Sequence, residues 1–482
     1  MTRKLIIGLV LLCLGSPTSQ AALDSYHAGP LFDEFPLTLA PGSRTEAVGP
    51  FFNLEQWEDG RQWAVPPLFS AGRDAGTDWA DFDLLYPLLT YDRYGSEYRF
   101  QILQLFSFAG GKNQEDAEAR RFTLFPFYFR QRSADPAKNY TALLPFYGDL
   151  RNRLFCDEIH FVIFPAYSRT RKKSVVTENY FVPFYHVRRG DGLAGWQLWP
   201  FYGTEHKTVT TRTNGFGDVE TVPGHDKKFV LWPIFLDQNQ GIGTENPEHQ
   251  RAFLPFFGFT RSPQRDSTSY LWPLGPTITD DRARGYHEVD APWPLIVFAH
   301  GEGKTTTRVW PFYSHAASTN LQSDFFLWPI YKFNRFQSPP LDRDRTRIAF
   351  FLYSHVNERN TDAHTVRQRT DFWPLFTHHR DFNGDTRLQL LAPLEPLLPN
   401  NKSIERNYSP LWSVWRAERN AQTGAASQSL LWNLYRRETT PESKKCSLLF
   451  GLFQYQSDSQ GRRGRLFYVP FGRKDGGQAP RG

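Results

Sequence analysis

A short apolar box built around a proline recurs along most of this chain, and it constrains the fold more than any other feature. Typical copies are Leu124-Phe125-Pro126-Phe127-Tyr128 and Leu198-Trp199-Pro200-Phe201-Tyr202, and the copies repeat about every nineteen residues. Self-similarity at a fixed period is typical of a repeat architecture, in which neighbouring units pack against each other. We count about 21 units, including degenerate copies that have lost the proline.

Each unit predicts one strand followed by one turn. The box residues are aromatic or branched, which favours strands. The intervals between boxes contain turn residues such as Asn214-Gly215 and Asn383-Gly384-Asp385. No segment has a convincing helical period, and short turn-rich connections favour antiparallel neighbours. The predicted fold class is therefore all-β: one large antiparallel repeat assembly of about 21 strand-turn units, closed like a barrel or a propeller.

The sequence places the box at the centre of each strand. Leu124 and Tyr128 share the face of the proline because alternate residues point the same way, and the opposite face often carries a tryptophan, as at Trp310 and Trp328. Strand centres buried on both sides are therefore expected. Because proline has no N–H for the ladder, we also predict a bend in each strand at the box.

The N-terminus predicts export. Arg3 and Lys4 precede an apolar run over residues 5–14, and small residues up to Ala21 suit signal peptidase. The run is too short for a membrane-spanning helix. We expect four regions: a signal peptide at 1–21, an irregular N-terminal segment at 22–62, a β-repeat domain at 63–473 and a flexible C-terminal tail at 474–482.

The net charge and the cysteine content limit which partners and which cellular compartment are expected. The formal charge of +6 falls to +4 once Arg3 and Lys4 are cleaved, and the basic residues are scattered between boxes, so no nucleic-acid partner is expected. Cys156 and Cys446 remain in the mature chain. An oxidising envelope permits a disulfide between them, and their separation in sequence leaves the pairing open.

No catalytic, metal-binding or cofactor-binding set emerges. His315, His355 and the pair His378-His379 follow boxes on different strands, too far apart to share one ion. Glu395 is the one acid that its apolar surroundings would bury, and no partner for it is evident. Motifs for a serine nucleophile, a phosphate loop and a dinucleotide site are absent from the sequence.

Aromatic residues outside the box pattern are the candidates for a ligand-stacking shelf, because ring faces suit glycans and cations. These off-pattern residues are Trp57, Trp63, Trp196 and Trp415.

Export, aromatic richness and many regular strands resemble the pattern of a bacterial outer-membrane β-barrel. The boxes are nevertheless half the length of a spanning strand, and a missing N–H is costly in lipid. We therefore favour a non-enzymatic cell-envelope protein that is structural or binds an envelope glycan, lipid or protein partner, in the periplasm or at the outer membrane. The alternatives are an outer-membrane β-barrel acting as a channel or export component, and an envelope hydrolase acting on polysaccharide.

Overall fold

The structure is a computed structural model of the 482-residue chain, and it describes residues 26–27, 31–112, 119–213, 215, 217–459 and 461–471. A single antiparallel sheet contains 44 strands, and two more strands form a separate hairpin. The all-β antiparallel class is confirmed. The expected signal peptide and C-terminal tail lie outside the described residues.

The strands of the large sheet pair in chain order, and the ladder passes over the separate hairpin at residues 210–222. The N-terminal third comprises β1 (Tyr26–His27), β2 (Asp33–Pro36), β3 (Ser43–Ala47), β4 (Phe52–Trp57), β5 (Gly60–Val65), β6 (Phe69–Asp74), β7 (Trp79–Leu84), β8 (Leu89–Tyr94), β9 (Glu97–Ile102), β10 (Phe106–Gly111), β11 (Ala119–Leu124), β12 (Tyr128–Arg132), β13 (Tyr140–Leu143), β14 (Tyr147–Arg153), β15 (Cys156–Val162) and β16 (Tyr167–Lys172). The middle third comprises β17 (Val175–Tyr180), β18 (Tyr185–Gly190), β19 (Leu193–Leu198), β20 (Tyr202–Lys207), β21 (Thr210–Thr213), β22 (Val219–Val222), β23 (Gly224–Val230), β24 (Phe235–Ile242), β25 (Glu248–Phe253), β26 (Phe257–Arg261), β27 (Arg265–Tyr270), β28 (Thr277–Asp281), β29 (Tyr286–Asp290), β30 (Ile296–Gly301) and β31 (Lys304–Val309). The remainder comprises β32 (Tyr313–Ser318), β33 (Leu321–Phe326), β34 (Tyr331–Ser338), β35 (Leu341–Ile348), β36 (Tyr353–Asn360), β37 (Thr365–Phe372), β38 (Phe376–Arg380), β39 (Thr386–Leu390), β40 (Trp415–Arg419), β41 (Ala426–Leu430), β42 (Tyr435–Thr439), β43 (Lys444–Leu448), β44 (Phe453–Asp458), β45 (Gly461–Leu466) and β46 (Val469–Phe471).

The box is a hairpin turn and not a strand centre. Leu124 ends β11 and pairs directly with Tyr128 at the start of β12, so residues 125–127 form the turn. The N–H of Phe127 donates a hydrogen bond of 2.8 Å to the carbonyl of Leu124, and the peptide bond before Pro126 is cis. The prediction of one strand per unit with a bend at the proline is therefore wrong. Each unit contains two strands, and a proline in the turn removes no ladder bond.

Consecutive antiparallel pairing aligns the box turns along one edge of the sheet, which we call the box rim. The other edge, the far rim, carries mainly polar turns such as Lys173-Ser174 and Asp191-Gly192. Side chains that follow the box proline project from the box rim, and Phe127, Phe146 and Phe201 are 56%, 60% and 57% exposed. The expectation that the boxes are buried on both faces is wrong for these turn residues.

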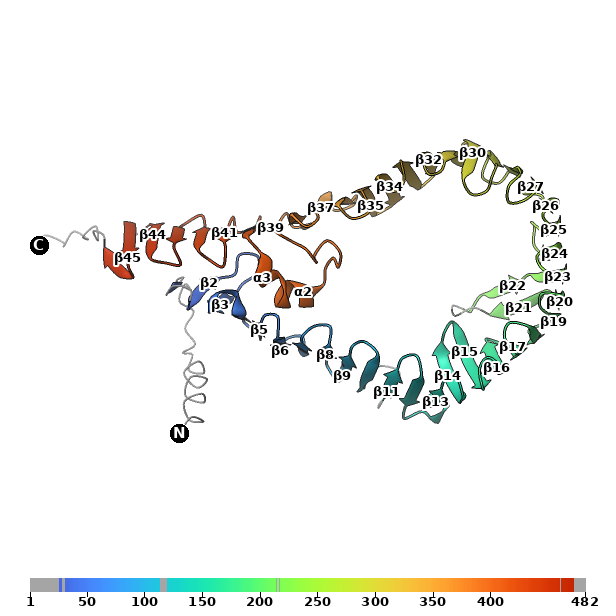
Figure 1. The fold of residues 1–482 in the computed structure, drawn as a ribbon, viewed down its shortest axis with the longest axis horizontal. Coiled ribbons are helices and arrows are strands. Elements are labelled where there is room, and N and C mark those ends of the chain that lie inside the picture. Colours follow the sequence, from blue (N-terminus) through green and yellow to red (C-terminus); the bar gives the residue numbers. More distant parts are fainter. Residues whose placement is uncertain are drawn as a thin grey trace, which may run out of the picture.

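The two faces of the sheet differ in chemistry. The sheet curves round helices α2 (Lys402–Asn407) and α3 (Ser409–Trp412), as Figure 1 shows, so the helices lie on its concave side. Arg406 of α2 contacts Asp83, and therefore the face of the sheet that carries Asp83 is the concave face. Beside the box turns the concave face carries small or polar residues, for example Ser168, Asn179 and Gln197. The convex face carries a row of large apolar residues, which in the same region are Leu124, Tyr128, Leu143, Tyr147, Val162, Tyr167, Tyr180, Tyr185, Leu198 and Tyr202.

The ladder is open, because within the described residues no pairing joins β46 to β1, so the predicted closure of the sheet as a barrel or a propeller is not confirmed. Instead the two ends of the curved sheet meet through their concave faces, and β44 and β45 continue beyond the meeting point (Figure 1). Thr38 after β2 donates to Ser427 of β41 at 2.6 Å, and the Arg436 guanidinium of β42 lies 3.3 Å from the ring centre of Phe35. Strands β2–β4 of this contact lie in the segment at 22–62 that the sequence predicts to be irregular, and they belong to the same sheet.

Candidate functional site

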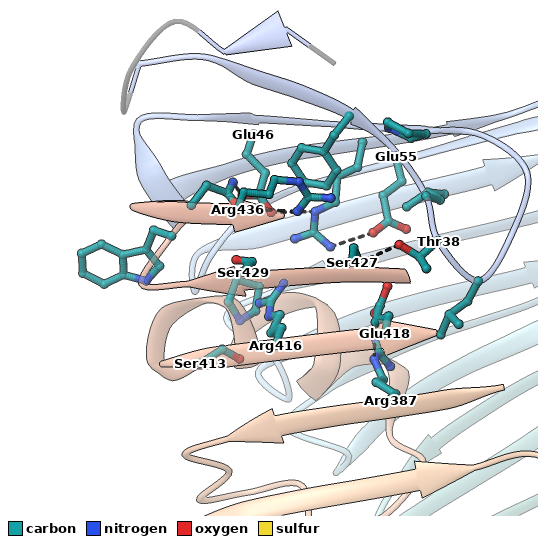
Figure 2. Close-up of a pocket in the computed structure, with 18 of the residues that line it drawn as sticks. Thr38, Glu46, Glu55, Arg387, Ser413, Arg416, Glu418, Ser427, Ser429 and Arg436 are labelled. Atoms are coloured by element: carbon teal, nitrogen blue, oxygen red, sulfur yellow. Dashed lines mark hydrogen bonds and ion pairs between the residues drawn. The ribbon is translucent and has the colours of Figure 1, made fainter. Parts of the chain in front are cut away.

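The overlap of the two sheet ends encloses a cavity of about 240 Å³. Figure 2 shows Glu46 and Glu55 from the N-terminal strands facing Arg416, Glu418 and Arg436 from the C-terminal strands. We call this set of contacts between the ends, together with the link from Arg406 to β7, the clasp.

Charged side chains of opposite sign are paired within the cavity. Arg44 forms ion pairs of 2.8 Å with both Glu46 and Glu55, and Arg387 lies 3.3 Å from Glu418. Burial alone would raise the pKa of Glu46, but the guanidinium groups of Arg44 and its neighbours outweigh burial and hold this pKa below its usual range. The carboxylate therefore stays ionised, and the cavity is suited to ion pairing and not to proton transfer.

Arg416 lies at the centre of the clasp. Burial and then the nearby Arg44 lower its pKa to about 10, so it remains protonated at neutral pH. Its side chain forms no ion pair or hydrogen bond with another described residue, while Ser413 beside it donates to the carbonyl of Ser409 at 2.7 Å. The arrangement provides an attractive field for the surrounding glutamates and no nucleophile paired with a base.

Arg406 links the inner helix to the opposite wall of the sheet. Its guanidinium bonds to Asp81, and it donates a second bond of 2.5 Å to Asp83, which also accepts from Asn407 at 3.1 Å. Burial raises the pKa of Asp81, and the charge of Arg406 opposes that rise. The side chains of Arg406 and Asp83 are each 5% exposed. This link therefore joins segments of the chain through a buried charge pair.

A cross-link tests the closure directly. The side-chain oxygens of Thr38 and Ser427 lie 2.6 Å apart, so cysteines at both positions should bring their sulfur atoms close enough to form a disulfide. In a background with Cys156→Ser and Cys446→Ser, we expect Thr38→Cys/Ser427→Cys to oxidise almost completely to a cross-linked monomer, measured by non-reducing electrophoresis and peptide mapping.

The matched control is Thr38→Cys/Gln428→Cys, because Gln428 lies one residue further along β41 on the convex face. This pair should remain reduced. Equal cross-linking of both pairs, or none in either, would show that the two ends do not meet as described.

Glu395 is buried, at 5% exposed, as its apolar surroundings predict, but Asp83 and Asp290 are buried as well, so the expectation that it is the one buried acid is wrong. Its carboxylate accepts hydrogen bonds from Gln389 at 2.7 Å, from the indole N–H of Trp412 at 3.0 Å and from Ser409. These partners are donors that fix the connection between β39 and β40 against the concave face. The geometry therefore gives Glu395 a structural role.

The four off-pattern tryptophans do not gather into one shelf. Trp57 and Trp63 lie on neighbouring strands but on opposite faces, because Trp63 pairs with Leu54. Trp196 on β19 is 43% exposed and lies 5.4 Å from Tyr202, whereas Trp415 on β40 stacks on Tyr435 at 6.1 Å. A ligand would therefore meet them one at a time.

The two cysteines are free thiols. Cys156 begins β15 and Cys446 lies in β43, on different parts of the curved sheet. A disulfide requires Cα atoms within about 7 Å, and the ladder separates these strands.

Histidines beside the boxes stay on separate strands, as the sequence predicts. His315 of β32, for example, pairs with Asp324 of β33 at 2.7 Å. Across the described ranges, no group of three or more His, Cys, Asp or Glu residues is placed to hold a metal ion.

Sequence reasoning missed both the box rim and the clasp as candidate sites. The rim could have been found by reading proline with its flanking aromatics as a turn, since proline is disfavoured inside strands. The clasp had no local signal, because it joins residues more than 300 positions apart, as Arg406 and Asp81 show.

In the part of the chain that the structure describes, no helix has the length and apolar character needed to cross a membrane. No protein-family profile and no curated protein matches this chain.

Proposed function

We propose that this is an exported, non-enzymatic protein of the bacterial cell envelope whose box rim binds lipid at a membrane surface. The observation that carries the proposal is the alignment of half-exposed aromatic turns along one edge of a very large sheet. Soluble monomers rarely expose contiguous apolar patches larger than a few hundred Å², and amphipathic surfaces of this kind suit the membrane interface.

The depth of the apolar band favours insertion into one leaflet. The row next to the turns is apolar on the convex face, but the following row carries charged pairs such as Asp149 with His160 at 2.8 Å and Asp237 with Arg251 at 3.1 Å. Turn and first row together extend roughly 5–10 Å, which matches the depth of interfacial binding. The charged second row is better suited to the aqueous side.

A membrane-spanning barrel that acts as a channel or export component is the second candidate. The apolar row on the convex face and the polar row on the concave face favour a spanning barrel. In such a barrel the clasp would join the two ends of the sheet, which no backbone pairing joins within the described residues. Most strands are about six residues long, roughly 20 Å, whereas a spanning strand needs about 9–11 residues. We therefore place this function second. The hydrolase alternative gains no support from Glu395 or from the clasp.

Removing rim aromatics should weaken lipid binding. In Phe127→Ser/Phe146→Ser/Phe201→Ser, three half-exposed rings leave the box rim. Each is expected to contribute about 1 kcal/mol to transfer into lipid, since complete burial of a Phe is worth about 1.5–3 kcal/mol. We expect the partition coefficient on phosphatidylcholine vesicles, measured by flotation, to fall about a hundredfold.

Phe155→Ser is the control on the far rim, where Phe155 is 95% exposed. It should float as the wild type does, and all these exposed sites should leave folding intact within about 0.5 kcal/mol each. Equal losses in both variants would contradict rim insertion. Retention in the membrane after carbonate washing, together with ion conductance in planar bilayers, would favour the spanning barrel.

A further inference from the structure

Four polar side chains form a square on the concave face of β34 and β35. Lys332 lies directly opposite Arg347 in the ladder, and Asn334 lies directly opposite Arg345. Opposed residues on neighbouring strands have Cβ atoms about 4.5–5.5 Å apart, and like charges in such a pair destabilise the sheet. The fold therefore holds cations together at a cost to its own stability.

No acid of the described structure forms an ion pair with this square, although the charge of Asp371 partly opposes the fall in the pKa of Arg345. The side chains of Lys332, Arg345 and Arg347 form no ion pair or hydrogen bond with any other described residue. Two nearby acids on the same face are already engaged, since Glu358 lies 3.4 Å from Arg343 and Asp371 lies 2.8 Å from Arg369.

Buried polar atoms in the square also lack partners. The Nε of Arg345 and the Oδ1 of Asn334 are buried without a hydrogen bond in the described structure. Burial, followed by the neighbouring cations Arg347 and Arg308, lowers the pKa of Lys332. Burial and the flanking arginines likewise lower the pKa of Arg345. Both pKa shifts reflect an excess of positive charge in the square, and a bound anion would stabilise that charge.

The square lies beside the box rim. Lys332 follows Tyr331, and Arg347 precedes Ile348, and both of these apolar residues flank box turns. If the turns enter the acyl region of a leaflet, the two cations lie one residue further out, where lipid phosphates are found. Guanidinium groups bind phosphate through paired hydrogen bonds, and ammonium groups bind it as point charges.

We infer that the concave square of Lys332, Asn334, Arg345 and Arg347 binds the phosphate groups of anionic lipid headgroups. This inference rests on the proposed lipid-binding function of the box rim and adds the class of lipid that is recognised. Each basic residue near an anionic membrane surface contributes about fivefold to binding, so three together should give about a hundredfold preference for anionic vesicles.

The test compares two triple variants with the same loss of charge. Lys332→Gln/Arg345→Gln/Arg347→Gln removes the concave cations, and Arg335→Gln/Arg359→Gln/Arg380→Gln removes three cations from the convex face of β34, β36 and β38. Flotation is measured on phosphatidylcholine vesicles with and without phosphatidylglycerol, and melting temperature is measured for each variant.

We expect the concave variant to lose the preference for anionic vesicles, to bind neutral vesicles as before and to melt no lower than the wild type, because repulsion is relieved. The convex control should keep the preference. A concave variant that retains it, or a wild type without any preference, would overturn the inference. The rim variant Phe127→Ser/Phe146→Ser/Phe201→Ser tests lipid insertion of the box rim alone, because its readout is binding to neutral vesicles. A failure of the rim proposal can therefore be told apart from a failure of the inference about anionic lipids.

Titration with inorganic phosphate distinguishes the phosphate of a lipid headgroup from the phosphate of a soluble compound. Titration calorimetry with phosphate should show no binding at millimolar concentration, because a lipid surface presents many phosphates together. Saturable phosphate binding that the concave variant abolishes, without any preference for anionic vesicles, would assign the square to a soluble phosphate compound and overturn the lipid assignment.

Discussion

Arg406→Met is expected to release the inner helices and separate the two ends of the sheet. The substitution leaves Asp81 and Asp83 as buried carboxylates without their cation, since the exposed fractions of their side chains are 11% and 5%. Breaking a buried ion pair by removing one partner typically costs about 3–5 kcal/mol. In a repeat protein each unit contacts mainly its neighbours, so this cost should appear as local opening and leave the other strands folded.

Amide hydrogen exchange measures this opening. We expect faster exchange in 402–412 and in β5–β7, with unchanged exchange in β15–β20. Arg406→Lys should be intermediate, because one ammonium group cannot reproduce a guanidinium bound to two carboxylates. Arg419→Met, an exposed arginine on β40, is the control and should exchange as the wild type does. Unchanged protection in Arg406→Met would mean that this link does not hold the ends together.

Asp290→Asn is expected to stabilise the protein above neutral pH. Asp290 of β29 is 5% exposed, its Oδ1 has no hydrogen bond within the described structure, and it lies opposite Thr277 in the ladder. Burial and then the charge of Glu288 raise its pKa from 3.8 to about 6. Because one pKa unit corresponds to about 1.4 kcal/mol, the ionised carboxylate costs the folded state up to about 3 kcal/mol.

Because the pKa of Asp290 is raised in the folded chain, its effect on stability falls in a defined pH range. Between 3.8 and about 6 the folded chain keeps a proton that the unfolded chain has lost, so the contribution of Asp290 to stability falls as pH rises through this window and is constant above it. Asn at this position should melt at a higher temperature than the wild type above pH 7 and equally below pH 4. Asp280→Asn, at an exposed acid on the convex face of β28, should show no such difference. A pH-independent difference for Asp290→Asn would refute the linkage.

Composition and connection length were sufficient to predict the antiparallel all-β class, because aromatic boxes separated by short turns leave no room for helical crossovers. The position of the strands was not predictable in the same way. Phe125 and Phe127 have high strand propensity, and that local preference conflicts with Pro126 between them. Leu124 pairs directly with Tyr128, so the residues between them form a turn, and the proline outweighs the strand propensity of its neighbours.

Helices α2 and α3 escaped detection because six and four residues are too short to show a helical period. The local signals were the N-cap of α2, in which Asn401 accepts from the N–H of Ile404 at 3.1 Å, and Pro410 in the first turn of α3. The clasp depends on contacts such as Asn433 with Glu46, separated by 387 positions, which no local pattern can reveal. The burial of Glu395 was predictable because its flanking residues are apolar.

If the box rim binds lipid, its turns enter the membrane while the far rim stays in water. An environment-sensitive fluorophore on Phe127→Cys or on Phe155→Cys, in a background without Cys156 and Cys446, reports each rim separately. On vesicles containing brominated lipids, we predict a blue shift and strong quenching at position 127 and neither change at position 155. Quenching at 155 but not at 127, or at neither position, would show that the box rim does not enter lipid.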